Sequence, residues 1–165
     1  MRSPDRRRLC AAVATGLALP LIGLHSAAWA RETALPVPTS LPEAARAAAV
    51  KGEPLILLIS LPGCPYCELV RRNYLLPGQR DAGWHTWQLN VNDRSARLIG
   101  FDERPTTAAL QTDAWRAKFT PTVLFFGSRG QEVAERLVGI SVPDFYGAYL
   151  DERLTTARKA LVLRR

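Results

Sequence analysis

One short segment with two cysteines constrains the fold of this chain more than any other feature. It follows the run 55–59, whose continuous apolar character is typical of a buried strand. It leads into the segment 67–76, where apolar residues recur at helical spacing. The sequence therefore predicts a strand, a turn at 60–63 and a helix, with both thiols in the first helical turn. The cysteine segment reads Cys64, Pro65, Tyr66 and Cys67.

The predicted position of Cys64 favours a reactive thiolate. At a helix N-terminus, unpaired backbone N–H groups and the positive end of the helix dipole stabilise the thiolate and lower the pKa of the thiol. Cys67 follows three residues later on the same face of the first turn, so it can attack a mixed disulfide formed by Cys64. Pro77-Gly78 is expected to end the helix. The pair is predicted to be catalytic, with Cys64 attacking and Cys67 resolving.

A cysteine pair can also form a structural disulfide or bind a metal ion. A structural disulfide usually closes a longer loop, where it constrains the unfolded chain more. A structural zinc site needs about four ligands, and His85 is the one histidine after residue 30. His85 is expected to be a surface or strand-edge residue, and Glu68 a solvated residue of the helix surface. Cu(I) can bind two thiolates, so a copper-binding or metallochaperone module remains the alternative from another class.

Residues 1–30 have the organisation of a secretory signal peptide. Arg6-Arg7-Arg8 precedes the uncharged apolar run 9–24, and Ala28-Trp29-Ala30 fits a cleavage site. The run is shorter than the roughly 20 residues that span a bilayer. We expect residues 1–30 to be removed and the protein to be exported. The third cysteine of the chain, Cys10, is lost with them.

Length and charge after this cleavage suit one ordinary domain. Residues 31–165 are enough for a single domain with a full core. The formal net charge of the whole chain is +7, and losing four arginines and one aspartate lowers it to +4. Because the basic residues alternate with acids, without a pattern of stacking aromatics, a nucleic-acid partner is not expected.

The remaining elements follow from apolar periodicity and turn residues. The second half contains a hairpin turn at 127–130. Thr112-Asp113 could divide the helix expected at 106–119 into two parts. The order of elements predicts an α/β fold with a mixed four- or five-stranded sheet and helices on both faces. We expect an extended arm at 31–40, helices at 41–50, 106–119 and 143–159, strands at 84–91, 122–126 and 132–138, a polar segment at 92–104 and a basic tail at 160–165. Ser40 is a candidate cap for the helix at 41–50, and Ser141 or Asp144 for the last helix.

With this order of elements, the chain resembles the thioredoxin superfamily from about Leu41 to Leu154. The strand followed by the cysteine segment carries the resemblance, together with Gly139 before the last helix and the sequence Phe119-Thr120-Pro121-Thr122 before an apolar strand. The resemblance implies a three-layer thioredoxin-like fold over 41–159. It also implies a cis Thr120–Pro121 bond beside Cys64, and supporting roles for Pro65, Tyr66, Thr120 and Pro121.

Within the superfamily, the chain looks most similar to exported thioredoxin-related proteins. That likeness implies a periplasmic thiol–disulfide oxidoreductase that reduces disulfide bonds of exported proteins, acts as a monomer and needs no bound cofactor. Its partners would be proteins with disulfide bonds and a membrane-bound reductase that restores the dithiol. The same atoms could donate a disulfide instead, so an oxidase is the alternative direction. Isomerase activity is the least favoured, because no dimerisation domain is recognised.

Three positions depart from cytosolic thioredoxins. Where those proteins carry a buried acid, a partner lysine and an aromatic residue, this chain has Leu58, Gln88 and Gly63. The proton shuttle of cytosolic thioredoxins is therefore not expected. Glutaredoxins also carry Cys-Pro-Tyr-Cys, but no glutathione site is recognised elsewhere in the chain.

Overall fold

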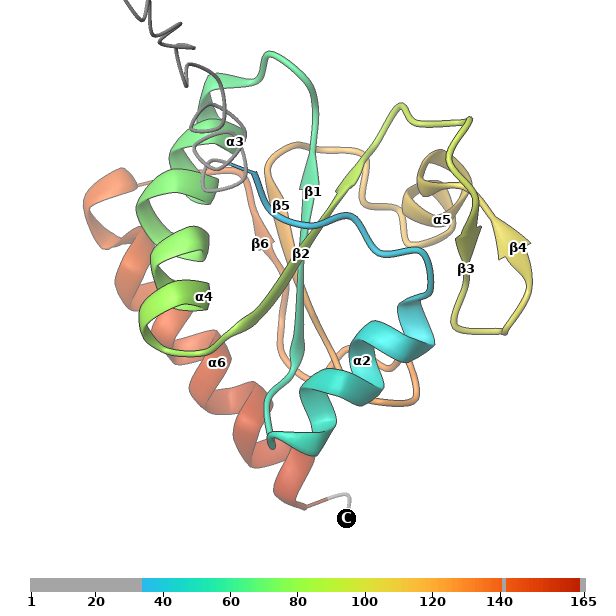
Figure 1. Ribbon diagram of the computed structural model, residues 1–165. Helices are drawn as coiled ribbons and strands as arrows, with labels where there is room; N and C mark the ends of the chain where they lie inside the picture. The colour runs from blue at the N-terminus through green and yellow to red at the C-terminus, as the bar shows by residue number, and fades with distance from the viewer. Residues whose placement is uncertain (1–33, 141, 164–165) are drawn as a thin grey trace, which may run out of the picture.

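A four-stranded sheet positions the cysteine segment (Figure 1). A computed structural model describes residues 34–140 and 142–163. The predicted signal peptide and Ser141 lie outside the described residues. The helices are α2 (Leu41–Val50), α3 (Pro65–Val70), the π-helix η1 (Arg71–Leu75), α4 (Leu76–Asp81), α5 (Ala108–Ala114), the 3-10 helix η2 (Pro143–Phe145) and α6 (Tyr146–Val162). The strands are β1 (Leu55–Ser60), β2 (His85–Asn90), β3 (Leu98–Ile99), β4 (Pro105–Thr106), β5 (Thr122–Phe126) and β6 (Leu137–Val138).

The sheet order β2-β1-β5-β6 brings two distant segments to one edge. Strand β1 pairs with β2 in parallel and with β5 in antiparallel orientation. Ile59, near the end of β1, lies opposite Thr122, the first residue of β5. The segment that follows β1 and the segment that precedes β5 therefore meet at the same edge of the sheet.

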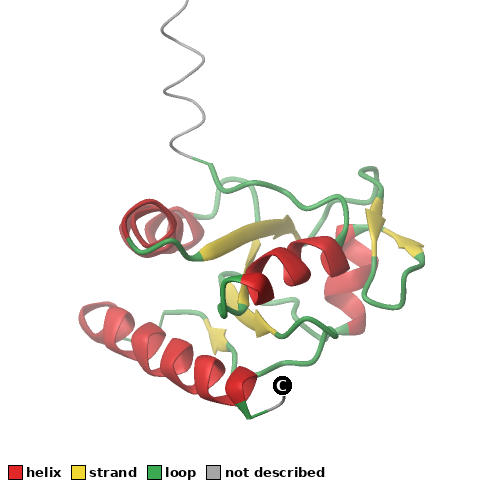
Figure 2. Cartoon of the chain, turned by 60° about the horizontal axis from the view of Figure 1, so that its bottom comes forward, coloured by secondary structure: helices red, strands yellow, loops and turns green. Residues whose placement is uncertain are grey.

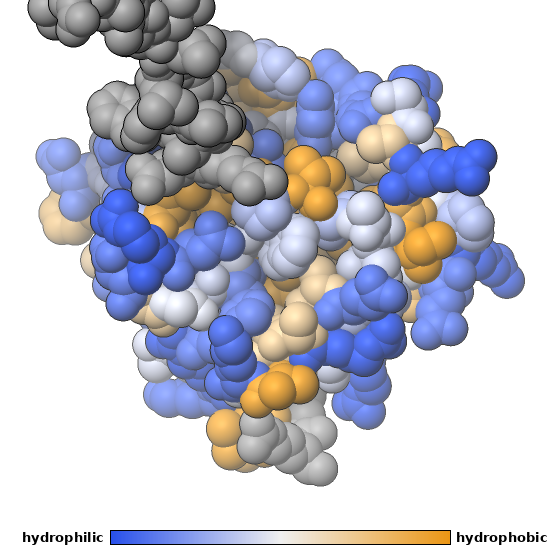
Figure 3. All heavy atoms as spheres, in the orientation of Figure 1, coloured by the Kyte–Doolittle hydropathy of each residue, from blue (hydrophilic) through white to orange (hydrophobic). Residues whose placement is uncertain are grey.

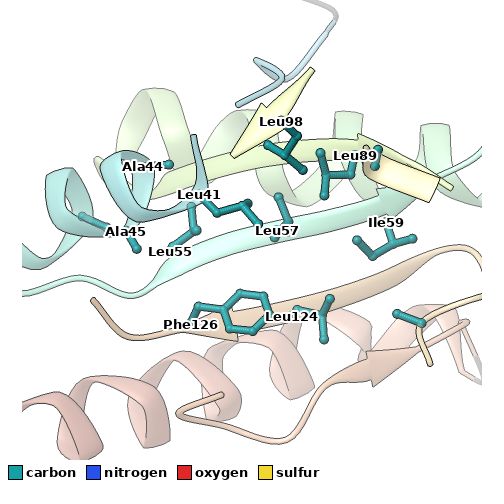
Figure 4. Packing of buried hydrophobic residues seen from close by; sticks show 13 residues of the cluster. Leu41, Ala44, Ala45, Leu55, Leu57, Ile59, Leu89, Leu98, Leu124 and Phe126 are labelled. Atoms are coloured by element: carbon teal, nitrogen blue, oxygen red, sulfur yellow. The ribbon is translucent and has the colours of Figure 1, made fainter. Parts of the chain in front are cut away.

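Alternation along β1 divides the core into two layers. Leu55, Leu57 and Ile59 face the cluster that includes α2, as Figure 4 shows. Ile56 and Leu58 face the opposite cluster, which includes residues of α3, η1 and α6. Every residue of β1 is buried, as the continuous apolar run predicted. Helices lie on both sides of the sheet (Figure 2), which confirms the predicted three-layer α/β fold.

The start of the described chain packs against the sheet in an extended conformation. Leu35 is buried, and the Gln88 backbone N–H donates to the Pro36 carbonyl at 2.9 Å. Helix α2 then begins at the predicted residue. The Ser40 hydroxyl accepts from the Glu43 N–H at 3.3 Å, which satisfies one of the unpaired donors of the first turn.

The prediction that Pro77-Gly78 ends the cysteine helix was wrong. The helix continues to Asp81 through a π-helical turn, in which the Leu76 N–H bonds to the Arg71 carbonyl. Pro77 therefore lies in the first turn of α4, where the missing N–H is tolerated. Gly78 is buried, and a Cβ at this position would collide with the Trp84 indole ring.

Helix α5 is shorter than the predicted 106–119. Thr107 caps it by accepting from the Leu110 N–H at 3.3 Å, and it ends at Ala114 because Arg116 adopts a left-handed φ of 55°. The helix runs through Thr112-Asp113 without a break. The polar segment before it contains β3, which pairs with β4 in a small second sheet that polar composition did not indicate.

The strand predicted at 132–138 is interrupted. A bridge joins Phe126 to Glu132, and regular pairing resumes where Val123 meets Leu137. Between these two pairs, the segment 132–137 therefore contains two more residues than the facing part of β5. Arg136, in the interruption, donates to the Trp115 carbonyl at 2.9 Å and pairs with Glu132. Leu137 and Val138 alone form the outer strand β6.

Helix α6 extends three residues beyond the predicted end at Lys159. Asp144 lies in η2 and makes no capping hydrogen bond. No helix in the described part of the chain is both long and apolar enough to cross a membrane. The face shown in Figure 3 is mostly hydrophilic with scattered apolar groups, as on ordinary water-exposed protein surfaces.

Candidate dithiol site

Cys64 is the residue that caps α3, as the sequence predicted. Its Sγ accepts a hydrogen bond from the Cys67 backbone N–H at 3.3 Å. The preceding turn is closed by the Cys64 N–H, which donates to the Leu61 carbonyl at 3.2 Å. Gly63 has a φ of +75°, a left-handed conformation that favours glycine. The turn geometry therefore explains why no aromatic side chain precedes Cys64.

The two thiols occupy different environments. Cys64 is partly exposed, whereas Cys67 is 0% exposed, and neither forms a disulfide in the structure. Partial burial opposes ionisation of Cys64, but hydrogen bonds from Cys67, Thr120 and Tyr66 outweigh it and lower the pKa of this thiol. Burial raises the pKa of Cys67, and the bond to Cys64 raises it further. Cys64 is therefore the thiol poised to act as a nucleophile.

The segment before β5 completes the site. The Thr120–Pro121 peptide bond is cis. The Thr120 hydroxyl donates to the Cys64 Sγ at 3.9 Å, across 56 positions of sequence. The Pro121 carbonyl accepts from the Gly139 N–H at 2.8 Å, which ties this segment to the outer strand region. The structure thus brings together the cysteines and the Thr-Pro step that the sequence singled out.

The surface around Cys64 is open to a partner. Pro65 and Tyr66, between the cysteines, are both exposed, Tyr66 to 60%. Phe119, just before Thr120, is 75% exposed. Exposed aromatic groups beside a reactive thiol can contact an apolar segment of a partner protein.

His85 does not belong to this site. It pairs with Leu55 at the start of β1, whereas Cys64 follows the end of that strand. Burial and the nearby Lys51 lower the pKa of His85. Among residues 34–140 and 142–163, no group of three or more His, Cys, Asp or Glu side chains is gathered as a metal site would require.

A cluster around the buried Arg71, one helical turn after Cys67, was not predicted from the sequence. The Arg71 guanidinium donates to Gln88 Oε1 at 2.8 Å and to Ser60 Oγ at 3.0 Å, and it also pairs with the Glu68 carboxylate. Glu68, expected on the surface, is half-exposed and also pairs with Arg72. Arg71 lies four residues after Cys67, on the same helix face, and this spacing is the signal that could have revealed it.

Leu58, which stands where cytosolic thioredoxins carry a buried acid, lies among apolar side chains. Leu58 is 0% exposed and packs in the cluster that contains Val70, Val123 and Phe125. Gln88, in place of the partner lysine, binds Arg71 instead.

Comparisons with known proteins agree with this architecture. The family model described as Thioredoxin-like domain matches residues 41–153. Thioredoxin O2 from Arabidopsis thaliana in its oxidised state is similar at 14% identity, with a TM-score of 0.50 over 74% of this chain and 96% of that one. The periplasmic thioredoxin SoxS from Paracoccus pantotrophus shows 22% identity and a TM-score of 0.42 over 64% of this chain and 99% of that one. No curated protein matches the chain in sequence.

Proposed function

The chain belongs to the family of thioredoxin-like domains, and we propose that it is an exported thiol–disulfide oxidoreductase that reduces disulfide bonds of secreted or periplasmic proteins. The observation that carries the proposal is the asymmetry of its two thiols. Cys64 is accessible and its pKa is lowered, whereas Cys67 is buried three residues away and its pKa is raised. This is the arrangement that an attacking and a resolving thiol require.

The reaction needs only these two thiols and a substrate disulfide. The Cys64 thiolate attacks one sulfur of the substrate, a Cys64–substrate disulfide forms, and the other substrate sulfur leaves as a thiolate. The Cys67 thiolate then attacks Cys64 Sγ, so that the Cys64–Cys67 disulfide forms and the second substrate thiolate is released. The substrate gains two electrons and the dithiol loses them. No bound cofactor takes part.

The proposed location and direction rest on the sequence. The basic, apolar and Ala-x-Ala regions of residues 1–30 support export and cleavage. In an oxidising compartment a reductase needs its dithiol restored, and we assign this role to a membrane-bound reductase. The protein would act as a monomer. Donation of the disulfide by an oxidase uses the same atoms in reverse, so direction is the property to measure.

Two measurements test the proposal. The reduced protein should reduce the disulfides of insulin when dithiothreitol is supplied, and Cys64→Ser should abolish this activity. In acid-quenched cells, alkylation should find Cys64 and Cys67 mostly as thiols, in a chain that begins at Arg31. A pair found oxidised would support the oxidase direction. Tight Cu(I) binding without disulfide reduction would support the metallochaperone alternative.

A further inference from the structure

A pocket beside the reactive thiol is lined mainly by the segment that links β2 to β5. We propose that this pocket binds an acidic side chain next to the disulfide-bonded cysteine of a substrate protein, and that Arg94 is the residue that selects it. Substrate segments with glutamate beside the cysteine would then react faster than neutral or basic segments. The inference rests on the proposed thiol–disulfide exchange and names the substrate class.

The pocket lies directly beside Cys64. It has a volume of about 460 Å³, and two of its lining residues form hydrogen bonds with this cysteine. The Thr120 hydroxyl donates to Cys64 Sγ at 3.9 Å, and the Leu61 carbonyl accepts from the Cys64 N–H at 3.2 Å. A side chain close to the cysteine of a bound substrate can therefore enter the pocket.

The backbone of Thr120 offers a place for an extended substrate segment. In the described part of the chain, no backbone hydrogen bond occupies the N–H or the carbonyl of Thr120. When an extended segment adds to such a free backbone edge, main-chain hydrogen bonds hold it and pockets for its side chains give specificity. Because Thr120 contacts Cys64 and also lines the pocket, a segment bound there brings the residues next to its cysteine to the pocket.

Hydrogen bonds hold the wall that α5 contributes to the pocket. The Asp93 carbonyl accepts from the Ala109 N–H at 2.8 Å, which ties α5 to the end of β2. The Asp93 carboxylate accepts from the Ser95 N–H at 2.8 Å, and the Thr112 carbonyl accepts from the Ala117 N–H at 2.8 Å. The wall is therefore formed in the free protein, so binding does not bear the entropic cost of ordering it.

The charges in the pocket favour an acidic occupant. Its lining carries two positive charges, Arg94 and Lys118, and one negative charge, Asp113. Lys118 and Asp113 form an ion pair at 2.6 Å and balance each other. Arg94 is exposed and forms no ion pair among the residues that the structure describes. The hydrogen bond from Lys118 lowers the pKa of Asp113 and the charge of Arg94 lowers it further, so the field of Arg94 extends into the pocket.

The apolar part of the lining suits the aliphatic stem of a glutamate. Leu61, Val91 and Leu110 supply this apolar surface. Binding pockets commonly combine apolar walls with a few placed polar groups that fix orientation. Contact of these walls with the CH₂ groups of a glutamate leaves its carboxylate free to pair with Arg94. Glutamate is therefore the side chain with which to test the pocket.

Peptides with a single cysteine, joined by a disulfide to a coloured aromatic thiol, measure the attack by Cys64. The full chain carries Cys10→Ala and Cys67→Ala, so that only Cys64 reacts. Its thiolate attacks the peptide sulfur, a Cys64–peptide disulfide forms, and the bond to the aromatic sulfur breaks. The aromatic thiolate leaves, because a thiol of lower pKa is the better leaving group.

Three peptides differ only in the two residues on each side of the cysteine, which are all glutamate, all glutamine or all lysine. The rate of a small free thiol with each peptide corrects for the intrinsic reactivity of its disulfide. After this correction, the parent chain should react about threefold faster with the glutamate peptide than with the glutamine peptide, and slowest with the lysine peptide. The preference should decrease as salt is added, because salt screens exposed charges.

Charge variants identify the selecting residue. Arg94→Glu should reverse the order, so that the lysine peptide reacts fastest, and a misfolded protein could not produce this gain. Asp113→Asn frees Lys118 and should increase the preference for glutamate about twofold. Arg129→Glu is the matched control, because it makes the same change in net charge in an exposed turn after β5, at the end of the sheet opposite Cys64. It should keep the order of the parent.

The outcomes separate the two proposals. If the parent reacts with no peptide faster than Cys64→Ser does, the proposed function fails. If the parent reacts but does not prefer the glutamate peptide, the function stands and the assignment of the pocket is overturned. Equal changes in Arg94→Glu and Arg129→Glu would also overturn it, because they would show that net charge and not the pocket sets the preference.

Discussion

The backbone N–H of Cys67 points at the sulfur of Cys64, 3.3 Å away. This single bond links the two thiols through the first turn of α3 and favours the charged form of Cys64. Because the donor belongs to the helix backbone, the bond survives substitution of the Cys67 side chain. The Cys67 side chain also forms a hydrogen bond with Cys64, so both the thiol and the backbone N–H of Cys67 lower the pKa of Cys64, together with Thr120.

Selective alkylation follows from this geometry. At pH 7 the folded, reduced chain with Cys10→Ala should take up one equivalent of iodoacetamide rapidly, at Cys64, because the pKa of this thiol is lowered. Cys67 should react only slowly, since it is buried and its pKa is raised. Peptide mapping after timed quenching measures both rates. Equal labelling of the two cysteines in the folded chain would contradict the assigned asymmetry.

The lowered pKa of Cys64 also predicts how stability depends on pH. Between the folded pKa and the ordinary value of 9.0, the unfolded chain binds more protons at this site than the folded chain does. The contribution of Cys64 to stability is therefore fully present above pH 9 and is lost as the pH falls through the folded pKa.

Urea titrations of the reduced protein from pH 5 to pH 9 measure this effect. The free energy of unfolding of the parent, minus that of Cys64→Ser, should increase with pH over this range. A difference that stays constant would show that folding does not change the pKa of Cys64.

Leu58 should tolerate no charge. Leu58→Asp is expected to lower the free energy of unfolding by about 3–5 kcal/mol, because it buries an unpaired carboxylate among apolar side chains. Leu58→Met, which conserves volume, should cost less than about 1.5 kcal/mol. Chemical denaturation checks both variants. A stable Leu58→Asp protein with faster exchange at neutral pH would show that this position can still host a proton-shuttling acid.

Two glycines should respond in opposite directions to alanine. Gly78→Ala places a methyl group against the Trp84 ring and should cost about 1–3 kcal/mol of unfolding free energy. Gly147→Ala, in the first turn of α6, meets Tyr74 at 3.4 Å, an ordinary contact, and should be neutral or stabilising by up to about 1 kcal/mol. Equal effects in thermal unfolding would contradict the close approach of α4 to Trp84.

Local patterns predicted the elements that local interactions define. The apolar run of β1, the Ser40 cap of α2 and the cysteine turn with Cys64 as cap are all encoded within a few residues. These elements also locate the candidate site, because Cys64 and Thr120 flank paired ends of β1 and β5.

The errors arose where the structure depends on interactions that local sequence patterns do not show. The helix passes Pro77 because a π turn shifts its hydrogen bonds, and the adjacent Gly78 allows Trp84 to approach. The outer strand is interrupted where Arg136 reaches the Trp115 carbonyl, 21 positions away in the sequence. Arg71 looked like one more helix arginine, since its partners Ser60 and Gln88 come from two strands.

Trapping of the mixed disulfide tests the central claim most directly. In the Cys10→Ala background, Cys67→Ala should accumulate a stable disulfide between Cys64 and a partner protein, visible on non-reducing gels and mapped by mass spectrometry. Cys64→Ala should accumulate none, because the buried Cys67 cannot attack a protein substrate. Adducts on Cys67 in Cys64→Ala, with none on Cys64 in Cys67→Ala, would contradict the account.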